Sequence, residues 1–213
     1  MKLRKSEVIV LIIILLSLAI SIYFNPKLPD KIVAHWDYKG EADGYMAKSR
    51  GIFLMPAFLF VLFLVFLFVP RLDPLKANVE KFRKYFDGFI ILLFMFMLVI
   101  HLQTILWALG TKIKPNVLFP VGLGVLFYYV GIMLNHSQRN WFIGLRTPWT
   151  LSSDSVWEKT HKFGAKLIKI SAVIAMSGAL FQNFAMFIVL APIIGSFIYL
   201  TVYSYIEYKK ENK

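Results

Sequence analysis

The chain contains no cysteine, so disulfides, thiolate metal ligands and a cysteine nucleophile are all excluded. It also lacks the phosphate-binding Gly-x-x-x-x-Gly-Lys pattern, the nucleophile-elbow Gly-x-Ser-x-Gly pattern and the His-Glu-x-x-His pattern. Charged residues make up 17% of its 213 residues. We therefore expect a protein that is not an enzyme and that holds no cofactor and no metal.

Apolar sequence dominates the chain, because 58% of its residues are hydrophobic and 20 are phenylalanine. A bilayer core about 30 Å thick is crossed by about 20 apolar helical residues. Runs of about that length predict six membrane-spanning helices at residues 8–24, 52–70, 89–109, 117–134, 166–182 and 184–205. The expected fold is all-α: a polytopic membrane protein with residues 1–213 in a single membrane domain.

The first apolar run has a second interpretation as a secretory signal peptide, because Lys2, Arg4 and Lys5 precede it. Against this interpretation, the run is longer than a typical signal core. The triplet Ala19-Ile20-Ser21 is also a poor cleavage site.

Lysine and arginine predict the orientation, because cytoplasmic connectors retain them. With the N-terminus inside, the inner segments hold 17 of these residues and the outer segments hold 7. We therefore expect a multi-pass protein of the cell membrane with both termini in the cytoplasm. Residues 25–51 form the expected extracellular loop, and residues 71–88 and 135–166 form the expected cytoplasmic loops.

The net charge of +12 raises the possibility of nucleic acid binding. The basic residues are, however, spread over several connectors next to the membrane and form no single stripe or known reading module. Anionic lipid headgroups are the better match for such a distribution. We expect no direct contact with nucleic acid.

The extracellular loop predicts a short extended segment, because Ile32, Ala34 and Trp36 alternate with Val33, His35 and Asp37 before glycine-bearing turns. The candidate ligand-binding or structural residues of this loop are His35, Trp36, Asp37, Tyr38, Gly40, Asp43 and Gly44. Trp36 and Tyr38 also suit the headgroup level of a membrane.

His35, Asp37 and Asp43 suggest an alternative, because the three side chains together could bind a metal. A metal-dependent membrane enzyme would need them to converge. The competing interpretation is a hydrogen-bonded polar cap over the helical bundle.

The first cytoplasmic loop carries Val79, Phe82 and Phe86 at helical spacing, with Lys81, Arg83 and Lys84 on other faces. This pattern predicts an interfacial helix whose apolar stripe rests in the lipid boundary. A docking helix for a partner protein is the alternative.

The second cytoplasmic loop has the densest set of candidate residues: Asn140, Phe142, Gly144, Arg146, Thr147, Pro148, Trp149 and Trp157. Pro148 biases its predecessor away from helix, and the following serines are good helix caps, so a helix should start near residue 153 and run into the fifth span. Arg146 can bind a carboxylate or phosphate through two bonds, or it can tie loop carbonyls or Asp154 together.

His101 is the one ionisable residue expected at membrane depth. It serves either as a hydrogen-bonding link between helices or as part of a transport pathway. Close helix packing is predicted by small residues in the fourth and fifth spans, namely Gly124, Gly131, Ser171, Ala175 and Ala179.

Two motifs together resemble the SdpI-type immunity protein family of six-span membrane proteins. One is the outer-loop pattern Leu28-Pro29, Ile32, His35-Trp36, Gly40, Asp43-Gly44. The other is the inner-loop pattern Asn140, Phe142, Gly144-Leu145-Arg146-Thr147-Pro148-Trp149-Thr150-Leu151, followed by Val156-Trp157. The resemblance covers essentially the whole chain.

The resemblance implies a membrane receptor that protects its host from a secreted antimicrobial peptide toxin. It also implies signalling, in which a small transcriptional repressor is retained at the membrane. On this hypothesis the outer loop faces the peptide and the basic inner surfaces hold the repressor. A small transporter or lipid-handling protein that uses His101 is the second hypothesis, and the metal-dependent enzyme is the third.

Overall fold

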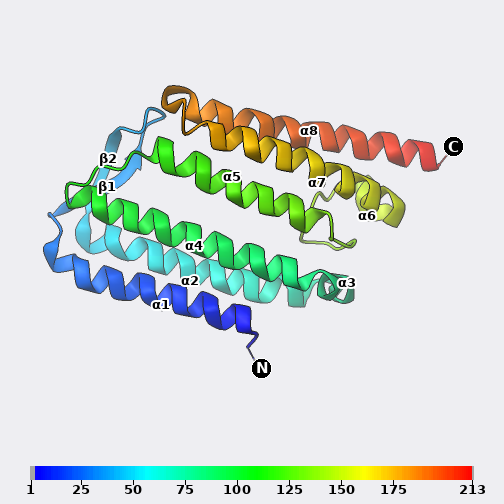
Figure 1. The fold of residues 1–213 in the computed structure, drawn as a ribbon. Helices are drawn as coiled ribbons and strands as arrows, with labels where there is room; N and C mark the ends of the chain where they lie inside the picture. Colours follow the sequence, from blue (N-terminus) through cyan, green and yellow to red (C-terminus); the bar gives the residue numbers. More distant parts are fainter. Residues whose placement is uncertain (1–2, 213) are drawn as a thin grey trace.

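The computed structural model describes residues 3–212, which fold into a bundle of long antiparallel helices with one β-hairpin (Figure 1). The long helices are α1 (Lys5–Phe24), α2 (Lys48–Leu72), α4 (Arg83–Ala108), α5 (Pro115–Leu134), α7 (Asp154–Ser177) and α8 (Ala185–Glu211). The shorter elements are β1 (Lys31–Trp36), β2 (Ala42–Ala47), α3 (Lys76–Lys81), α6 (Pro148–Ser152) and the 3-10 turns Asn25–Lys27 and Gln182–Phe184.

The bundle has two distinct ends, which lie at the left and right of Figure 1. The left end carries the hairpin β1–β2, and we call it the hairpin end. The right end carries the start of α1, the end of α8 and the short helices α3 and α6, and we call it the terminal end. The two candidate loops of the sequence therefore lie at opposite ends of the molecule.

The chain is a multi-pass membrane protein, because α1, α2, α4, α5 and α8 are each long and apolar enough to cross a bilayer. Helix α7 is of similar length, but it carries Lys159, Lys162, Lys166 and Lys169 in its first two thirds. The structure thus has five clear candidate spans within residues 3–212. The sixth crossing, by α7, stays a prediction.

The six long helices form two groups of three. The larger apolar core joins α1, α2, α3 and α4, where Leu59, Phe82 and Phe94 are fully buried. A second group consists of α5, α7 and α8, with Ile168 and Leu200 at its centre. Helices α4 and α5 connect the groups, as the edge-to-face contact between Phe96 and Phe119 shows.

Glycines bring α5 and α7 close together, as the small residues predicted. A Cβ atom at Gly124 would lie 2.8 Å from the carbonyl oxygen of Ala172, and one at Gly131 would lie 2.9 Å from that of Ala165. Both distances are too short for real carbon atoms. The two backbones can approach this closely only because these positions lack side chains.

A proline in α2 explains the polar contact between α1, α2 and α4. Pro56 has no N–H, so the carbonyl of Ile52 loses its helical partner. The hydroxyl of Ser21 on α1 lies 2.9 Å from that carbonyl, and Nε2 of His101 on α4 lies 3.0 Å from the same hydroxyl. His101 is 3% exposed, and this contact places it as the predicted link between helices.

The apolar stripe of residues 71–88 does not rest in the lipid boundary, contrary to the sequence-based expectation. Val79 and Phe82 are 0% exposed and Phe86 is 3% exposed, and all three belong to the larger core. The periodicity correctly indicated one buried face. It did not reveal that this face packs on α1 and α2 rather than on lipid.

Gly131→Leu should lower the free energy of unfolding by about 1–3 kcal/mol, because α5 and α7 must move apart to admit the side chain. The matched control is Gly195→Leu in α8, where an added Cβ meets nothing within 4 Å. Thermal unfolding of both variants in the same detergent measures the difference. Equal stability of the two variants would contradict the tight α5–α7 contact.

Candidate functional site

The hairpin pairs β1 and β2 in antiparallel register, with Val33 opposite Tyr45 and His35 opposite Gly44. The register is irregular on both sides of His35, and neighbouring Ile32 and Val33 are both buried, so the burial does not follow the simple alternation predicted from sequence. Gly44 is required at its position, because a Cβ there would lie 2.8 Å from that of His35.

Two of the three candidate metal ligands meet in this hairpin. Nδ1 of His35 lies 2.5 Å from a carboxylate oxygen of Asp43 on the exposed surface. The Asp37 carboxylate instead accepts hydrogen bonds from the backbone N–H groups of Lys39 and Glu41, at 2.9 and 2.8 Å. Asp37 therefore stabilises the turn, where Gly40 has φ +77°. Within residues 3–212, no three His, Asp or Glu side chains are arranged to hold a metal ion, so the convergence that the metal-enzyme hypothesis requires is not formed there.

The hairpin is fixed to the bundle by apolar and aromatic contacts. Ile32 is 2% exposed and packs with Ile52 of α2 and Ile105 of α4. Trp36 meets Trp107 of α4 edge to face, with the ring centres 5.8 Å apart. The hairpin is thus packed as a cover on one end of the bundle.

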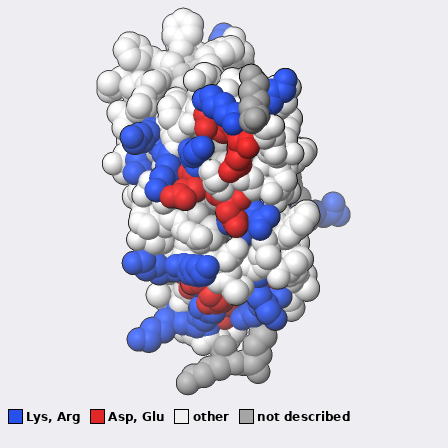
Figure 2. Space-filling model, turned by 90° about the vertical axis from the view of Figure 1, so that its right-hand side faces the viewer, with Lys and Arg blue, Asp and Glu red and all other residues white. Residues whose placement is uncertain are grey.

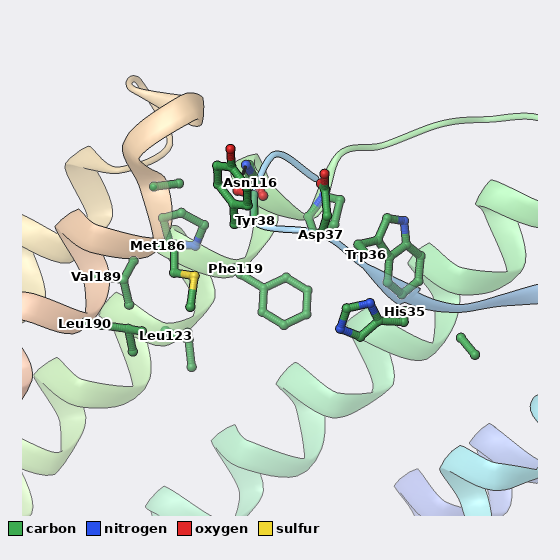
Figure 3. A pocket seen from close by; sticks show the side chains of 14 residues that line it. His35, Trp36, Asp37, Tyr38, Asn116, Phe119, Leu123, Met186, Val189 and Leu190 are labelled. Carbon is green, nitrogen blue, oxygen red and sulfur yellow. Dashed lines mark hydrogen bonds between the residues drawn. The ribbon is translucent and has the colours of Figure 1, made fainter. Parts of the chain in front are cut away.

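A cavity of about 600 Å³ lies beside this cover, between β1, α5 and α8 (Figure 3). His35, Trp36, Asp37 and Tyr38 border it on the hairpin side, and Phe119 projects between the hairpin and α8. Its remaining walls are mostly apolar, from Ala34, Pro115, Asn116, Pro120, Leu123, Ala185, Met186, Val189 and Leu190. Its size and apolar lining are those of a small-ligand or side-chain binding site.

Asn116 closes one edge of the cavity, and sequence reasoning missed it. Its side-chain amide donates to the carbonyl of Tyr38 at 3.0 Å and to that of Gln182 at 2.8 Å. One side chain thereby joins the hairpin, α5 and the turn before α8. Asn116 directly follows Pro115 at the start of α5, which is only a weak sequence signal. The role of the residue becomes evident only from its tertiary contacts.

At the terminal end, Asn140 organises the inner-loop motif from within. The side chain is 0% exposed. Its amide donates to the carbonyls of Gln138 and Ile143, and its oxygen accepts from the N–H groups of Phe142 and Ile143 at 3.0 and 2.6 Å. All the hydrogen-bonding capacity of the side chain thus serves the loop backbone.

His161 is a second organiser that the sequence did not reveal. Its Nε2 accepts the backbone N–H of Leu145 at 3.0 Å, and its Nδ1 lies 2.9 Å from the carbonyl of Trp157. Since an amide N–H can only donate, Nε2 must be unprotonated and the ring neutral. Gly144 permits this approach, because it has φ +111° and a Cβ there would lie 2.6 Å from Nε2.

Burial holds His161 in that neutral form, because desolvation disfavours the charged ring and lowers its pKa to about 4. Trp157 stacks on the ring at 4.0 Å and is itself 2% exposed. The indole N–H of Trp157 donates to the carbonyl of Ser137 at 3.2 Å. Trp157, which belongs to α7, therefore connects the inner loop to this helix.

Thr147 and Pro148 begin the short helix α6. The Thr147 hydroxyl accepts the N–H of Thr150, and it also meets the hydroxyl of Ser204 on α8 at 3.0 Å. Trp149 packs on Tyr205 of α8 at 5.0 Å. Helix α7 then starts at residue 154 with Ser153 as its cap, which confirms the predicted start near residue 153.

Arg146 lies on the surface and donates one hydrogen bond to the carbonyl of Trp141, at 3.0 Å. It does not bind Asp154, whose carboxylate pairs with Arg139 at 2.7 Å. Trp141 and Phe142 are 50% and 41% exposed. The loop thus presents two aromatic rings and one arginine on a backbone that buried groups hold in place.

A buried ion-pair cluster joins three helices at the same end. Glu7 of α1 lies 2.9 Å from Arg71 of α2 and 3.7 Å from Arg83 of α4, and Arg83 also pairs with Asp87 at 2.6 Å. Glu7 and Arg83 are 6% and 5% exposed. Figure 2 shows that acidic groups gather in the middle of this end, with lysines and arginines around them.

Fold and sites together describe a multi-pass membrane protein with an apolar cavity at one end and an ordered aromatic and basic loop at the other. Residues 137–204 match the model of the SdpI/YfhL protein family, and residues 12–60 match that of a domain of unknown function, DUF1648. The chain is 26% identical over 209 residues to the Immunity protein SdpI of Bacillus subtilis (strain 168), covering 98% of each chain. No solved structure matches it. The inner-loop motif lies in the segment that matches the SdpI/YfhL family, and the chain is similar over nearly its full length to this immunity protein.

Asn140→Ala should lower the free energy of unfolding by more than about 2 kcal/mol, because it leaves buried loop groups without partners. Arg146→Ala is the control, since it removes one exposed hydrogen bond and should cost less than about 1 kcal/mol. Thermal unfolding and the amount of each variant in the membrane are the measurements. A stable Asn140→Ala protein would show that the loop does not depend on this side chain.

His161 predicts a pH-dependent stability. Between pH 6.5 and about 4 the unfolded chain takes up a proton at residue 161 that the folded chain excludes. The free energy of unfolding should therefore fall as the pH falls, by up to about 1.4 kcal/mol per pH unit from this group. His161→Gln keeps an acceptor for Leu145 but cannot titrate. Unfolding midpoints at pH 7, 6 and 5 should drop less for this variant, and parallel curves would contradict the assignment.

Proposed function

We propose that this protein is a membrane immunity protein that protects its host from a secreted antimicrobial peptide. The similarity to the Immunity protein SdpI of Bacillus subtilis (strain 168) supports this proposal, because the alignment covers 98% of both chains. The observation that carries it is the cavity beside the hairpin, because a receptor for an amphipathic peptide needs a place for apolar side chains.

The cavity has the chemistry for that role. Its floor is formed by apolar residues of α5 and α8, such as Leu123 and Val189, while His35, Asp37 and Tyr38 supply polar groups at the hairpin side. Leu123 lies about 10 Å along α5 from Asn116, so the cavity reaches into the apolar depth of the bundle. A peptide could place apolar side chains in it and keep polar groups at the rim.

The proposal includes the orientation and the signalling role. With the hairpin end outside and both termini in the cytoplasm, the peptide reaches the cavity directly. The terminal-end loop would then hold a small repressor, and its exposed Trp141, Phe142 and Arg146 are residue types that often dominate protein interfaces. The buried network of Asn140 supports this role, because a pre-ordered surface loses little entropy on binding.

Tyr38→Ala and Met186→Trp should both weaken protection, the first by removing a cavity wall and the second by filling the cavity. The measurement is survival of a sensitive host that expresses each variant, challenged with the killing peptide countered by the family's namesake. Tyr45→Ala and Met186→Leu are the matched controls. Tyr45 is also exposed on the hairpin but does not line the cavity, and leucine nearly preserves the volume of methionine.

Protection that is lost in the two test variants and kept in the controls, at equal membrane levels, would support the proposal. No protection by well-inserted wild-type protein would overturn it for this peptide. Arg146→Ala in the same assay tests the terminal-end loop. Protection that survives this change would exclude its guanidinium from the mechanism.

A further inference from the structure

Lys169 of α7 lies in a notch on α5 that a glycine creates. A Cβ atom at Gly131 would be 2.6 Å from Cγ of Lys169 and 3.4 Å from its Cε. The aliphatic part of the lysine therefore occupies the space that any other residue at position 131 would fill. This contact fixes the path of a normally flexible side chain.

The charged end of Lys169 emerges beside Tyr128 of α5. Its Nζ is 5.9 Å from the centre of the tyrosine ring, near the limit of a cation–π contact. Lys166 lies one turn away on the same helix and is exposed. Tyr128 is 42% exposed, so it is accessible beside the ammonium group of Lys169.

These two lysines differ from the other two on α7. Lys159 pairs with Glu207 at 3.5 Å, and Lys162 pairs with Glu158 at 2.6 Å. Among residues 3–212, no carboxylate pairs with Lys166 or Lys169. The unpaired cations are also the two nearer the hydrophobic part of the helix.

The depth of Lys169 along the helix favours an anionic partner. Gly131 and Tyr128 precede the end of α5 at Leu134 by three and six residues, or about 4.5 and 9 Å. Helix α5 is a candidate membrane span, so Lys169 lies near the boundary between headgroups and acyl chains. A cation at such a depth is costly unless an anion or water meets it.

We propose that Lys166, Lys169 and Tyr128 form a binding site for the headgroup of an anionic phospholipid in the leaflet at the terminal end. The two ammonium groups bind the phosphodiester, and the tyrosine hydroxyl donates a hydrogen bond to it. The site is distinct from the cavity and does not depend on the proposed immunity function.

The surface next to the lysines identifies a lipid as the occupant. Exposed apolar residues lie deeper along the same two helices, namely Val125 on α5 and Ile170 and Val173 on α7. Positions 166, 169/170 and 173 follow one helical face. Cations at one level and apolar side chains below them match a phospholipid, which has an anionic headgroup above acyl chains.

The test measures lipid binding by the purified full-length protein in detergent, using native mass spectrometry and thermal unfolding with added phosphatidylglycerol or phosphatidylcholine. Wild type should bind the anionic lipid more tightly and gain thermal stability from it. The double variant Lys166→Gln/Lys169→Gln should lose about tenfold or more in that affinity, because each lysine near an anionic surface adds a severalfold gain.

The control is Lys159→Gln/Lys162→Gln, which removes two paired lysines from the same helix and should keep near wild-type affinity. Lys169→Arg should retain binding, since it keeps the charge. Unchanged affinity in the Lys166→Gln/Lys169→Gln variant would overturn the site. Equal stabilisation of wild type by inorganic phosphate at the same concentration would also overturn the assignment to a lipid. Neither result depends on whether the protein confers immunity.

Discussion

The structure depends on one constraint: a polar group inside an apolar bundle must find its partner within the protein. Pro56 creates such a demand by freeing the carbonyl of Ile52, and the Ser21 hydroxyl meets it from a neighbouring helix. His101 completes the contact from a third helix. The resulting junction of α1, α2 and α4 lies toward the hairpin end, where it supports the helices under the hairpin. The hydrogen bond that is missing inside α2 thus favours one assembly of α1, α2 and α4.

At the terminal end, the buried groups that need partners are the charge of Glu7 and the backbone of the inner loop. Glu7 is stabilised by two arginines from α2 and α4, so burying its charge requires all three helices to be in place. Asn140 and His161 perform the corresponding task for the inner-loop motif, where the loop backbone would otherwise bury unpaired groups. The exposed aromatic side chains of this loop are therefore presented by a fixed backbone. At each end of the bundle, the buried polar groups therefore hold the exposed residues in place.

The sequence predicted local features well, because their causes are local. The helix start at Ser153 follows from its cap, the extended segment around Trp36 follows from its alternation, and the close approach at Gly131 follows from small residues. Features that depend on tertiary partners were missed. Neither the burial of Phe82 nor the bond from Leu145 to His161 can be read from spacing, since a pattern indicates a buried face but not what covers it. The cavity likewise could not be predicted from the sequence, because β1, α5 and α8 form it together.

Helix α5 connects the sites, since it lines the cavity with Phe119 and Leu123, contacts α7 through its glycines and supplies Tyr128 to the lysine site. Because Gly124 and Gly131 allow backbone contact, α5 and α7 should move as one body rather than slide independently. On the other side, α5 borders the cavity and has room beside α8. Because α7 also packs on α8, through Ile168 and Leu200 and through the hydroxyls of Ser171 and Ser196 at 2.8 Å, α8 should follow any movement of the α5–α7 pair. Any signal from the hairpin end to the terminal-end loop should then travel through this pair, whose far end holds Trp157 and His161.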